Sequence, residues 1–209
     1  VKREVQMSKK LFILFIFLSV VGLCCSAYSA ILDLSFDPDF GFATGPGGGR
    51  SIGIYVNQDF VMTSFGIYGN LISTSYDVVV YSSLNGRTPS SVLAIYTDDL
   101  TNSGLNWYDI STNFTLEKDT YYILNWRPTD RTLHAQWVKS PGLEYYYDTQ
   151  LPKNFGLLTV VEGIEGYDAQ SAGNFLHAHF RIGYQQGGGP VIPEPTTLFL
   201  LGSSLIGLG

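Results

Sequence analysis

Cysteine and charged residues are both scarce in this chain of 209 residues. The two cysteines, Cys24 and Cys25, lie in an apolar segment near the N-terminus. The remainder of the chain therefore has no disulfide, no thiolate metal site and no cysteine nucleophile. Charged residues make up 14% of the sequence and the net charge is −6, which argues against binding to nucleic-acid phosphates. No heptad pattern runs through the chain, which excludes a coiled coil.

The N-terminal region has the layout of a secretory signal peptide. Lys9 and Lys10 precede an apolar run from Leu11 to Leu23, and small residues follow at Cys25-Ser26-Ala27. The run is shorter than the ~20 residues needed to span a membrane, so a cleaved signal is favoured over an anchor. We expect residues 1–30 to form this signal region, with a helix in its apolar part, and we expect export through the inner membrane.

The C-terminal region has the features of a second targeting signal. Three glycines at 187–189 predict a flexible spacer over residues 187–192. Pro193, Glu194 and Pro195 follow directly, and the stretch from Leu198 to Gly209 is rich in leucine and glycine.

This arrangement resembles the PEP-CTERM sorting signal of Gram-negative bacteria. The resemblance implies that residues 193–209 are a sorting tail with an apolar helix. It also implies an exosortase partner, a transient contact of the tail with the membrane, and a final place at the cell surface or in the exopolysaccharide matrix. The chain reaches Gly209 without the basic cluster that usually ends such tails, which indicates a truncated or degenerate tail.

Between the predicted signal peptide and the predicted sorting tail, residues 31–186 show the two-residue periodicity of β-strands. The segment 174–184 alternates apolar residues with His177, His179 and Arg181. The other segments that we expect to be strands are 64–69, 75–82, 91–97, 106–110, 120–126, 133–138, 143–147 and 157–161. Asn85-Gly86 and Pro89 predict a turn over 82–91. Many short strands with turns between them predict an all-β domain, an antiparallel β-sandwich.

The stretch 63–126 resembles a module of secreted bacterial β-sandwiches. It contains the segments SFGIYG, YDVVVYSSLNGRTPSSVLAIY and GLNWYDISTNFTLEKDTYYILNW. Such modules are jelly rolls similar to galactose-binding-like and carbohydrate-binding domains, so the resemblance implies a jelly-roll-like sandwich. Trp107 and Trp126 fall within the pattern and are expected in the core. Asp119 stands where the module usually has glycine.

Two groups of residues are candidate metal ligands. Asp33, Asp37 and Asp39 place three carboxylates within seven residues, which suits a structural Ca²⁺ because that ion accepts many oxygen ligands in irregular geometry. The same spacing is typical of the solvent face of an edge strand. His177 and His179 lie on one face of a predicted strand and are weaker candidates for a divalent metal, which would need His134 or a carboxylate as a third ligand. A polar strand face explains them equally.

Aromatic residues offer a candidate glycan site. Trp137, Tyr145 and Tyr147 lie outside the module pattern and beside polar residues. Exposed rings of this kind stack on the C–H faces of sugars, although aromatic residues also fill cores. We therefore expect that an extracellular polysaccharide is the partner.

No nucleophile motif such as G-x-S-x-G and no H-E-x-x-H is present. The sequence favours a non-catalytic surface or matrix protein, and an edge strand offers self-association as a second route to that role. The alternative is a secreted glycan-active or metal-dependent hydrolase on the same scaffold. Its candidate acids are Glu144, Glu162 and Glu165, since glycoside hydrolysis needs two carboxylates.

Overall fold

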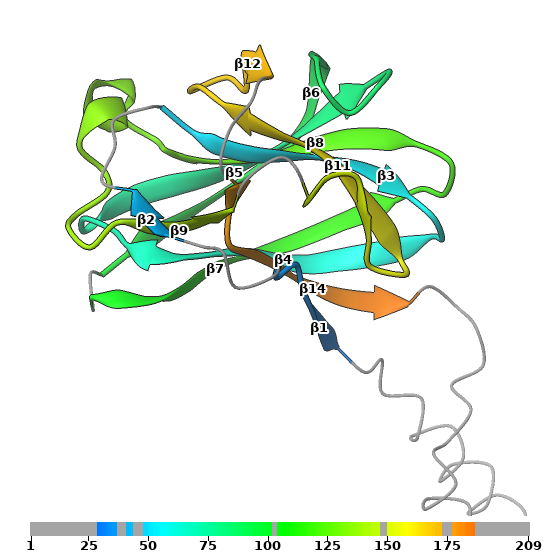
Figure 1. The fold of residues 1–209 in the computed structure, drawn as a ribbon, viewed down its shortest axis with the longest axis horizontal. Helices are drawn as coiled ribbons and strands as arrows, with labels where there is room; N and C mark the ends of the chain where they lie inside the picture. The colour runs from blue at the N-terminus through cyan, green and yellow to red at the C-terminus, as the bar shows by residue number, and fades with distance from the viewer. Residues whose placement is uncertain are drawn as a thin grey trace, which may run out of the picture. The chain divides into compact units, whose positions relative to one another are not determined.

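The computed structural model describes residues 29–36, 41–43, 48–101, 104–146, 150–172 and 177–186. They belong to one compact unit, Ser29–Gly187. The predicted signal peptide and the sorting tail with its motif lie outside the described residues. Within these residues the fold is all-β, with two large antiparallel sheets, a small third sheet and one short 3₁₀-helix (Figure 1). None of the described helices has the length and apolar character required to cross a membrane.

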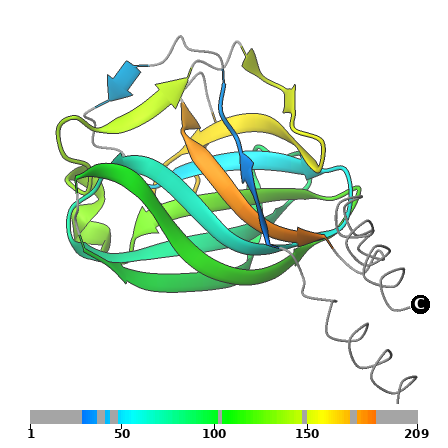
Figure 2. The same cartoon turned by 90° about the horizontal axis from the view of Figure 1, so that it is seen from below.

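The first sheet has four antiparallel strands in the order β1-β14-β4-β7. Their bounds are β1 (Ala30–Asp33), β14 (Phe180–Gln186), β4 (Phe60–Asn70) and β7 (Leu105–Leu116). Strand β1 pairs with β14, so the beginning and the end of the domain lie side by side in one sheet (Figure 2).

The second sheet has seven strands, in the order β10-β11-β3-β8-β5-β6 with β12 also paired to β11. Their bounds are β3 (Arg50–Val56), β5 (Thr74–Ser83), β6 (Pro89–Leu100), β8 (Tyr121–Pro128), β10 (Lys153–Asn154), β11 (Leu158–Glu165) and β12 (Ser171–Ala172). The small sheet, β13-β9-β2, consists of β13 (His177–Ala178), β9 (Leu143–Tyr146) and β2 (Gly41–Ala43).

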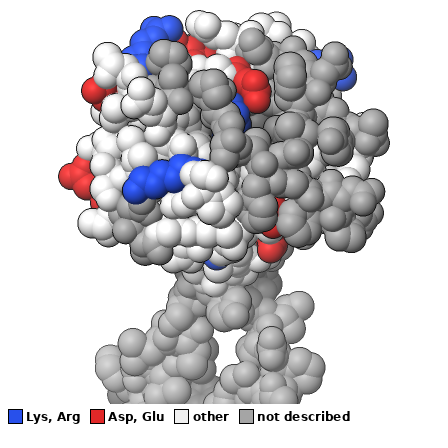
Figure 3. All heavy atoms as spheres, turned by 60° about the vertical axis from the view of Figure 1, so that its left-hand side comes forward, with Lys and Arg blue, Asp and Glu red and all other residues white. Residues whose placement is uncertain are grey.

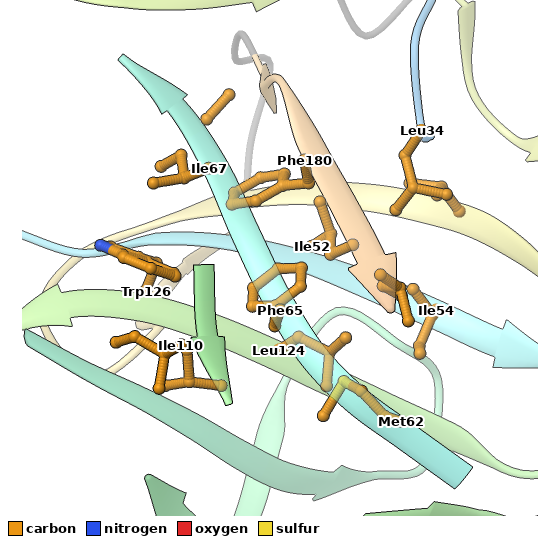
Figure 4. Packing of buried hydrophobic residues seen from close by; sticks show 14 of the residues in the cluster. Leu34, Ile52, Ile54, Met62, Phe65, Ile67, Ile110, Leu124, Trp126 and Phe180 are labelled. Atoms are coloured by element: carbon orange, nitrogen blue, oxygen red, sulfur yellow. The ribbon is translucent and has the colours of Figure 1, made fainter. Parts of the chain in front are cut away.

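The hydrophobic core lies between the two large sheets (Figure 4). Alternate residues of each strand point inward, so Phe65 of β4 stacks on Phe180 of β14 with ring centroids 4.9 Å apart. Phe65 also reaches Trp126 of β8 in the opposite sheet at 6.4 Å. Trp126 is fully buried, which confirms its expected place in the core. The two sheets therefore form a sandwich around one continuous core.

Two turns follow directly from local chemistry. Strands β5 and β6 form the expected hairpin, in which Asn85 Oδ1 accepts hydrogen bonds from the backbone N–H groups of Arg87 at 2.8 Å and Thr88 at 3.0 Å. Asp119, between β7 and β8, has φ of +60°. This is the left-handed region in which glycine is favoured and aspartate is tolerated.

The prediction of one strand is wrong. Residues 133–138 were predicted to be extended, but Arg131–Ala135 form the 3₁₀-helix η1. The side chain of Asp130 accepts a hydrogen bond from the backbone N–H of Thr132 at 2.8 Å and caps this helix. Only Val138 makes a β-bridge, to Leu71. The local cap therefore overrides the alternating pattern of the segment.

Candidate binding face of the four-stranded sheet

The outer face of the four-stranded sheet carries a row of charged residues. Asp33 of β1, Arg181 of β14, Gly66 of β4 and Asp109 of β7 lie directly opposite one another across the strands. Arg181 makes a bidentate ion pair with Asp109, with Nε 2.7 Å from Oδ1 and Nη2 close to Oδ2.

Gly66 makes this ion pair geometrically possible. A side chain at this position would overlap the carboxylate of Asp109, and its Cβ would lie 3.0 Å from Cγ of Arg181. Because the strand between them has no side chain here, Arg181 and Asp109 meet across it. The hydrogen bonds that Arg181 donates to the Asp109 carboxylate raise the pKa of Arg181 above its usual value, so the guanidinium stays charged.

An aromatic row lies next to the charged row. Tyr68 of β4 is paired with Trp107 of β7, with ring centroids 5.5 Å apart. Trp107 also contacts His179 edge-on at 4.7 Å, and Cζ of Arg181 lies 4.4 Å from the centre of the Trp107 ring. This last contact is a cation–π interaction. We name Asp33, Tyr68, Trp107, Asp109, Glu144, His179 and Arg181 the open cluster.

The expectation that Trp107 belongs to the core is wrong. Its neighbours Tyr108 and Ile110 are buried, while Trp107 and Asp109 alternate with them and point to the outer face, half-buried. Tyr68, Asp109 and Arg181 were not singled out from the sequence. The i, i+2 pairs Trp107–Asp109 and His179–Arg181 were the available signal, because such spacing places two side chains on one strand face.

His179 links three segments of the chain through its two ring nitrogens. Nε2 lies 2.8 Å from Oδ1 of Asp33, and Nδ1 lies close to Oε2 of Glu144. A histidine ring donates to two carboxylates only when both nitrogens carry protons. In this arrangement each ring nitrogen faces a carboxylate oxygen.

The candidate metal ligands are only partly described. Asp33 belongs to the open cluster, whereas Asp37 and Asp39 lie outside the described residues. The side chain of His177 and that of His134 are also outside them. In the described part of the chain, no group of three or more His, Cys, Asp or Glu side chains is arranged to hold a metal ion. The predicted calcium site therefore stays a prediction.

Trp137 is not a surface aromatic residue, and this part of the glycan-site prediction is wrong. It is 1% exposed and packs against Tyr76 at 5.9 Å. The reason is that Tyr76 donates a hydrogen bond to the Trp137 carbonyl at 3.3 Å, and the same carbonyl accepts from Ile72 at 3.0 Å. These bonds hold the segment after η1 against the sandwich. Tyr147 and the side chain of Tyr145 lie outside the described residues.

Each of the three glutamates of the hydrolase alternative is paired with a basic side chain rather than with another glutamate. Glu162 lies 3.1 Å from Arg87, and Glu165 lies 3.3 Å from Arg50. Glu144 is paired with His179 on a different strand. Buried Tyr146 lies 5.7 Å from the His179 ring, and its pKa is raised by burial first and by nearby Glu144 second.

A similar group of residues occupies the outer face of the seven-stranded sheet. Arg127 of β8 lies 3.5 Å from Asp77 and 2.6 Å from Asp168, and its Cζ is 4.4 Å from the centre of the Tyr167 ring. We name Asp77, Arg127, Tyr167 and Asp168 the capped cluster, because the segment 166–170 folds over the sheet at this point.

Hydrogen bonds of Tyr167 hold the segment 166–170 against the sheet. Asn125 donates to the Tyr167 carbonyl at 2.8 Å, and the Tyr167 hydroxyl donates to the Thr129 carbonyl at 2.7 Å. Ala169 is fully buried and belongs to a small second core with Val79, Tyr81, Ile123 and Ile164.

Strand β6 forms one edge of the seven-stranded sheet and is paired only with β5. Its exposed apolar side chains are Val92, Leu93 and Ile95. The register shifts between Val80 and Tyr81 and again between Tyr81 and Ser83 mark bulges along this edge, and bulges discourage further strand pairing. Self-association through an edge strand stays a prediction. On the described surface in Figure 3, charged side chains lie singly or in small groups among uncharged residues.

Comparison with family models, curated proteins and solved structures found no match to this chain.

Proposed function

We propose that the protein is an exported, non-catalytic surface or matrix protein whose sandwich domain binds a glycan through the open cluster. The observation that carries this proposal is the outer-face arrangement of Trp107 and Tyr68 beside Asp33, Asp109 and Arg181. Sugars are recognised by flat aromatic surfaces together with charged groups that hydrogen-bond to hydroxyls. The half-buried ring of Trp107 has Arg181 Cζ 4.4 Å from its centre and lies on the same outer face as the carboxylate of Asp109.

The strand order supports assigning the domain to the jelly rolls. The order β1-β14-β4-β7 faces the order β3-β8-β5-β6. The chain crosses between the sheets from β3 to β4, from β4 to β5, from β6 to β7 and from β7 to β8. Two four-stranded sheets joined in this way are the arrangement of a jelly roll, and β11, β10 and β12 extend the second sheet beyond β3. Many jelly rolls bind carbohydrates, but the fold by itself does not assign that function.

The position of the domain's ends supports display on a surface. Ala30 lies opposite Tyr184, so the chain enters and leaves the domain at one end of the paired strands β1 and β14. Asp33 and His179 lie at the other end of the same strands. At about 3.3 Å per residue, the seven residues of β14 separate the two ends by roughly 23 Å. A domain tethered through its C-terminal side would thus hold the aromatic row away from the tether.

The hydrogen bonds of His179 support a non-catalytic role. General base catalysis needs a ring nitrogen within reach of a substrate proton. Both nitrogens of His179 face carboxylates instead, which suits a group that positions strands and fixes the shape of a surface. Of the three glutamates of the hydrolase alternative, Glu162 and Glu165 are paired with arginines, and Glu144, together with Asp33, contacts the ring of His179.

A binding experiment tests the glycan proposal. The purified full chain would be incubated with the exopolysaccharide of the producing strain, and bound protein would be recovered with the polymer, in calcium and in EDTA. We expect retention that Trp107→Ala abolishes, while Tyr167→Phe at the capped cluster leaves it unchanged. Loss of retention in EDTA would favour the predicted calcium site at Asp33, Asp37 and Asp39. Retention that is unchanged in Trp107→Ala would contradict the proposal, and shortened polymer in the supernatant would favour the hydrolase.

A second experiment tests sorting separately. Glu194→Ala changes the centre of the predicted sorting motif without touching the sandwich. In a host with exosortase, we expect the variant to accumulate with the cell membrane fraction and the unaltered chain to reach the surface or the medium. Identical distribution of the two proteins would contradict the sorting proposal and leave the glycan proposal to its own test.

A further inference from the structure

The carboxylates of the open cluster outnumber its cations. Asp33, Asp109 and Glu144 contribute three negative charges, while Arg181 and a doubly protonated His179 contribute at most two positive charges. The guanidinium of Arg181 is already engaged by both oxygens of Asp109. The whole chain adds to this balance with a net charge of −6.

Asp33 is the part of the cluster most accessible to a ligand. Its side chain is 55% exposed, compared with 14% for His179. Only one of its oxygens is used by His179 Nε2, and an ionised carboxylate has lone pairs for several further donors. A sugar lying against Trp107 would therefore meet hydrogen-bond acceptors with negative charge on the same face.

From this charge pattern we infer that the open cluster selects against acidic polysaccharides and favours glycans that carry protonated amines, with neutral glycans between them. This inference rests on the proposed glycan-binding function. A polymer of uronic acids would bring its carboxylates to Asp33 and Asp109, where like charges repel. A glucosamine ammonium group would instead donate hydrogen bonds to Asp33 while its ring contacts Trp107.

The test compares three defined probes with the purified full chain. These are chitosan oligomers at a pH that protonates their amines, a neutral β-glucan, and polygalacturonate. We expect the affinity to follow that order at low salt. We also expect added salt to reduce the difference between chitosan and the neutral glucan, because salt screens exposed charges.

Single variants locate the effect at the cluster. Asp33→Asn retains a hydrogen-bonding group for His179 but removes one charge, so we expect its affinity for chitosan to fall about threefold and its affinity for the neutral glucan to fall less. Asp98→Asn on β6 is the matched control, because it makes the same change in net charge on the other sheet and is expected to leave both affinities unchanged.

The outcomes separate this inference from the function on which it rests. Tighter binding of polygalacturonate than of chitosan, abolished by Trp107→Ala, would overturn the charge selectivity but keep the glycan-binding function. Equal losses in Asp33→Asn and Asp98→Asn would also overturn the inference, since the effect would then come from overall charge. Failure to bind any of the three probes and the strain's own polymer would overturn both. Thermal unfolding of each variant would show that a loss of binding is not a loss of folding.

Discussion

The two outer faces of the sandwich carry nearly the same set of groups in different surroundings. In each, an arginine lies 4.4 Å from the centre of an aromatic ring and is paired with carboxylates: Arg127 with Tyr167, and Arg181 with Trp107. In the capped cluster the side chain of Arg127 is 12% exposed and that of Asp77 is 9% exposed. In the open cluster the corresponding values are 24% for Arg181 and 32% for Asp109.

The difference comes from one segment of chain. Residues 166–170 fold over the seven-stranded sheet and bring Tyr167 and Asp168 onto Arg127. Arg127 and Asp77 are buried there, while the side chain of Asp168 is 36% exposed. Among the described residues, the open cluster is assembled from four strands and β9, and Arg181 and Asp109 are more exposed there than Arg127 and Asp77 are in the capped cluster. The same residue types are therefore structural where the chain covers them and accessible to a ligand where it does not.

The largest effect expected is from Arg127→Ala. This change leaves Asp77, which is almost fully buried, without its cation, and removal of one partner of a buried ion pair costs about 3–5 kcal/mol. Arg181→Ala removes a more exposed pair and should cost about 1 kcal/mol. Unfolding in urea would measure both. Equal losses would mean that the two clusters do not differ in burial as described.

Gly66→Ala should have a smaller effect that is confined to the open cluster. The new Cβ would overlap Asp109 and force it away from Arg181. Because the obstacle is a side chain that can move, we expect a loss of about 1–2 kcal/mol in the free energy of unfolding, together with loss of glycan retention. Gly53→Ala is the contrasting variant, since its Cβ would overlap the backbone carbonyl of Gly86 and should destabilise the domain more. If Gly66→Ala still retained the glycan normally, glycan binding would not depend on the ion pair between Arg181 and Asp109.

Alkaline pH should affect the tyrosine beneath the open cluster by a still smaller amount. Burial raises the pKa of Tyr146 above its usual value of about 10. The folded protein therefore keeps a proton that the unfolded chain releases, and this contribution to stability is complete below about pH 10 and is lost as the pH rises further. Tyr146→Phe should make the free energy of unfolding fall less steeply above pH 10. An identical slope would contradict this assignment.

The smallest effect is expected from Arg131→Ala. Arg131 lies 3.7 Å from Asp168 and over the Tyr167 ring, but its side chain is largely exposed. Exposed ion pairs contribute about 0–1 kcal/mol, so its removal should change the free energy of unfolding by less than about 0.5 kcal/mol. A larger loss would show that the capped cluster depends on both arginines.

The strands of the sandwich could be predicted well from the sequence where β-branched and aromatic residues are concentrated. The expected strand over 75–82 corresponds to β5, and the turn at Asn85-Gly86 joins β5 to β6 as predicted. These features depend on residues close together in the chain. The predicted strand over 133–138 failed because the side chain of Asp130 offers its own hydrogen bonds to the backbone and starts a 3₁₀ turn.

The candidate site was predicted only in part. His179 and Asp33 were singled out as metal ligands, but the structure joins them to each other and to Glu144. Trp137 was predicted to be exposed but is buried, and Trp107 was predicted to be in the core but lies on the outer face. Alternation shows which residues share a face of a strand, but it does not show which of the two faces another layer will cover.

The sequence by itself determined that the chain is β-rich and that its hairpin turns at Asn85-Gly86. These properties follow from short-range backbone preferences and the two-residue period. Only the tertiary structure decided that β1 and β14 pair, that Gly66 lets Arg181 reach Asp109, and that one of the two arginine clusters is covered. These features depend on contacts between residues far apart in the chain. The residue pattern along a single strand does not specify which other strands will pair with it or cover it.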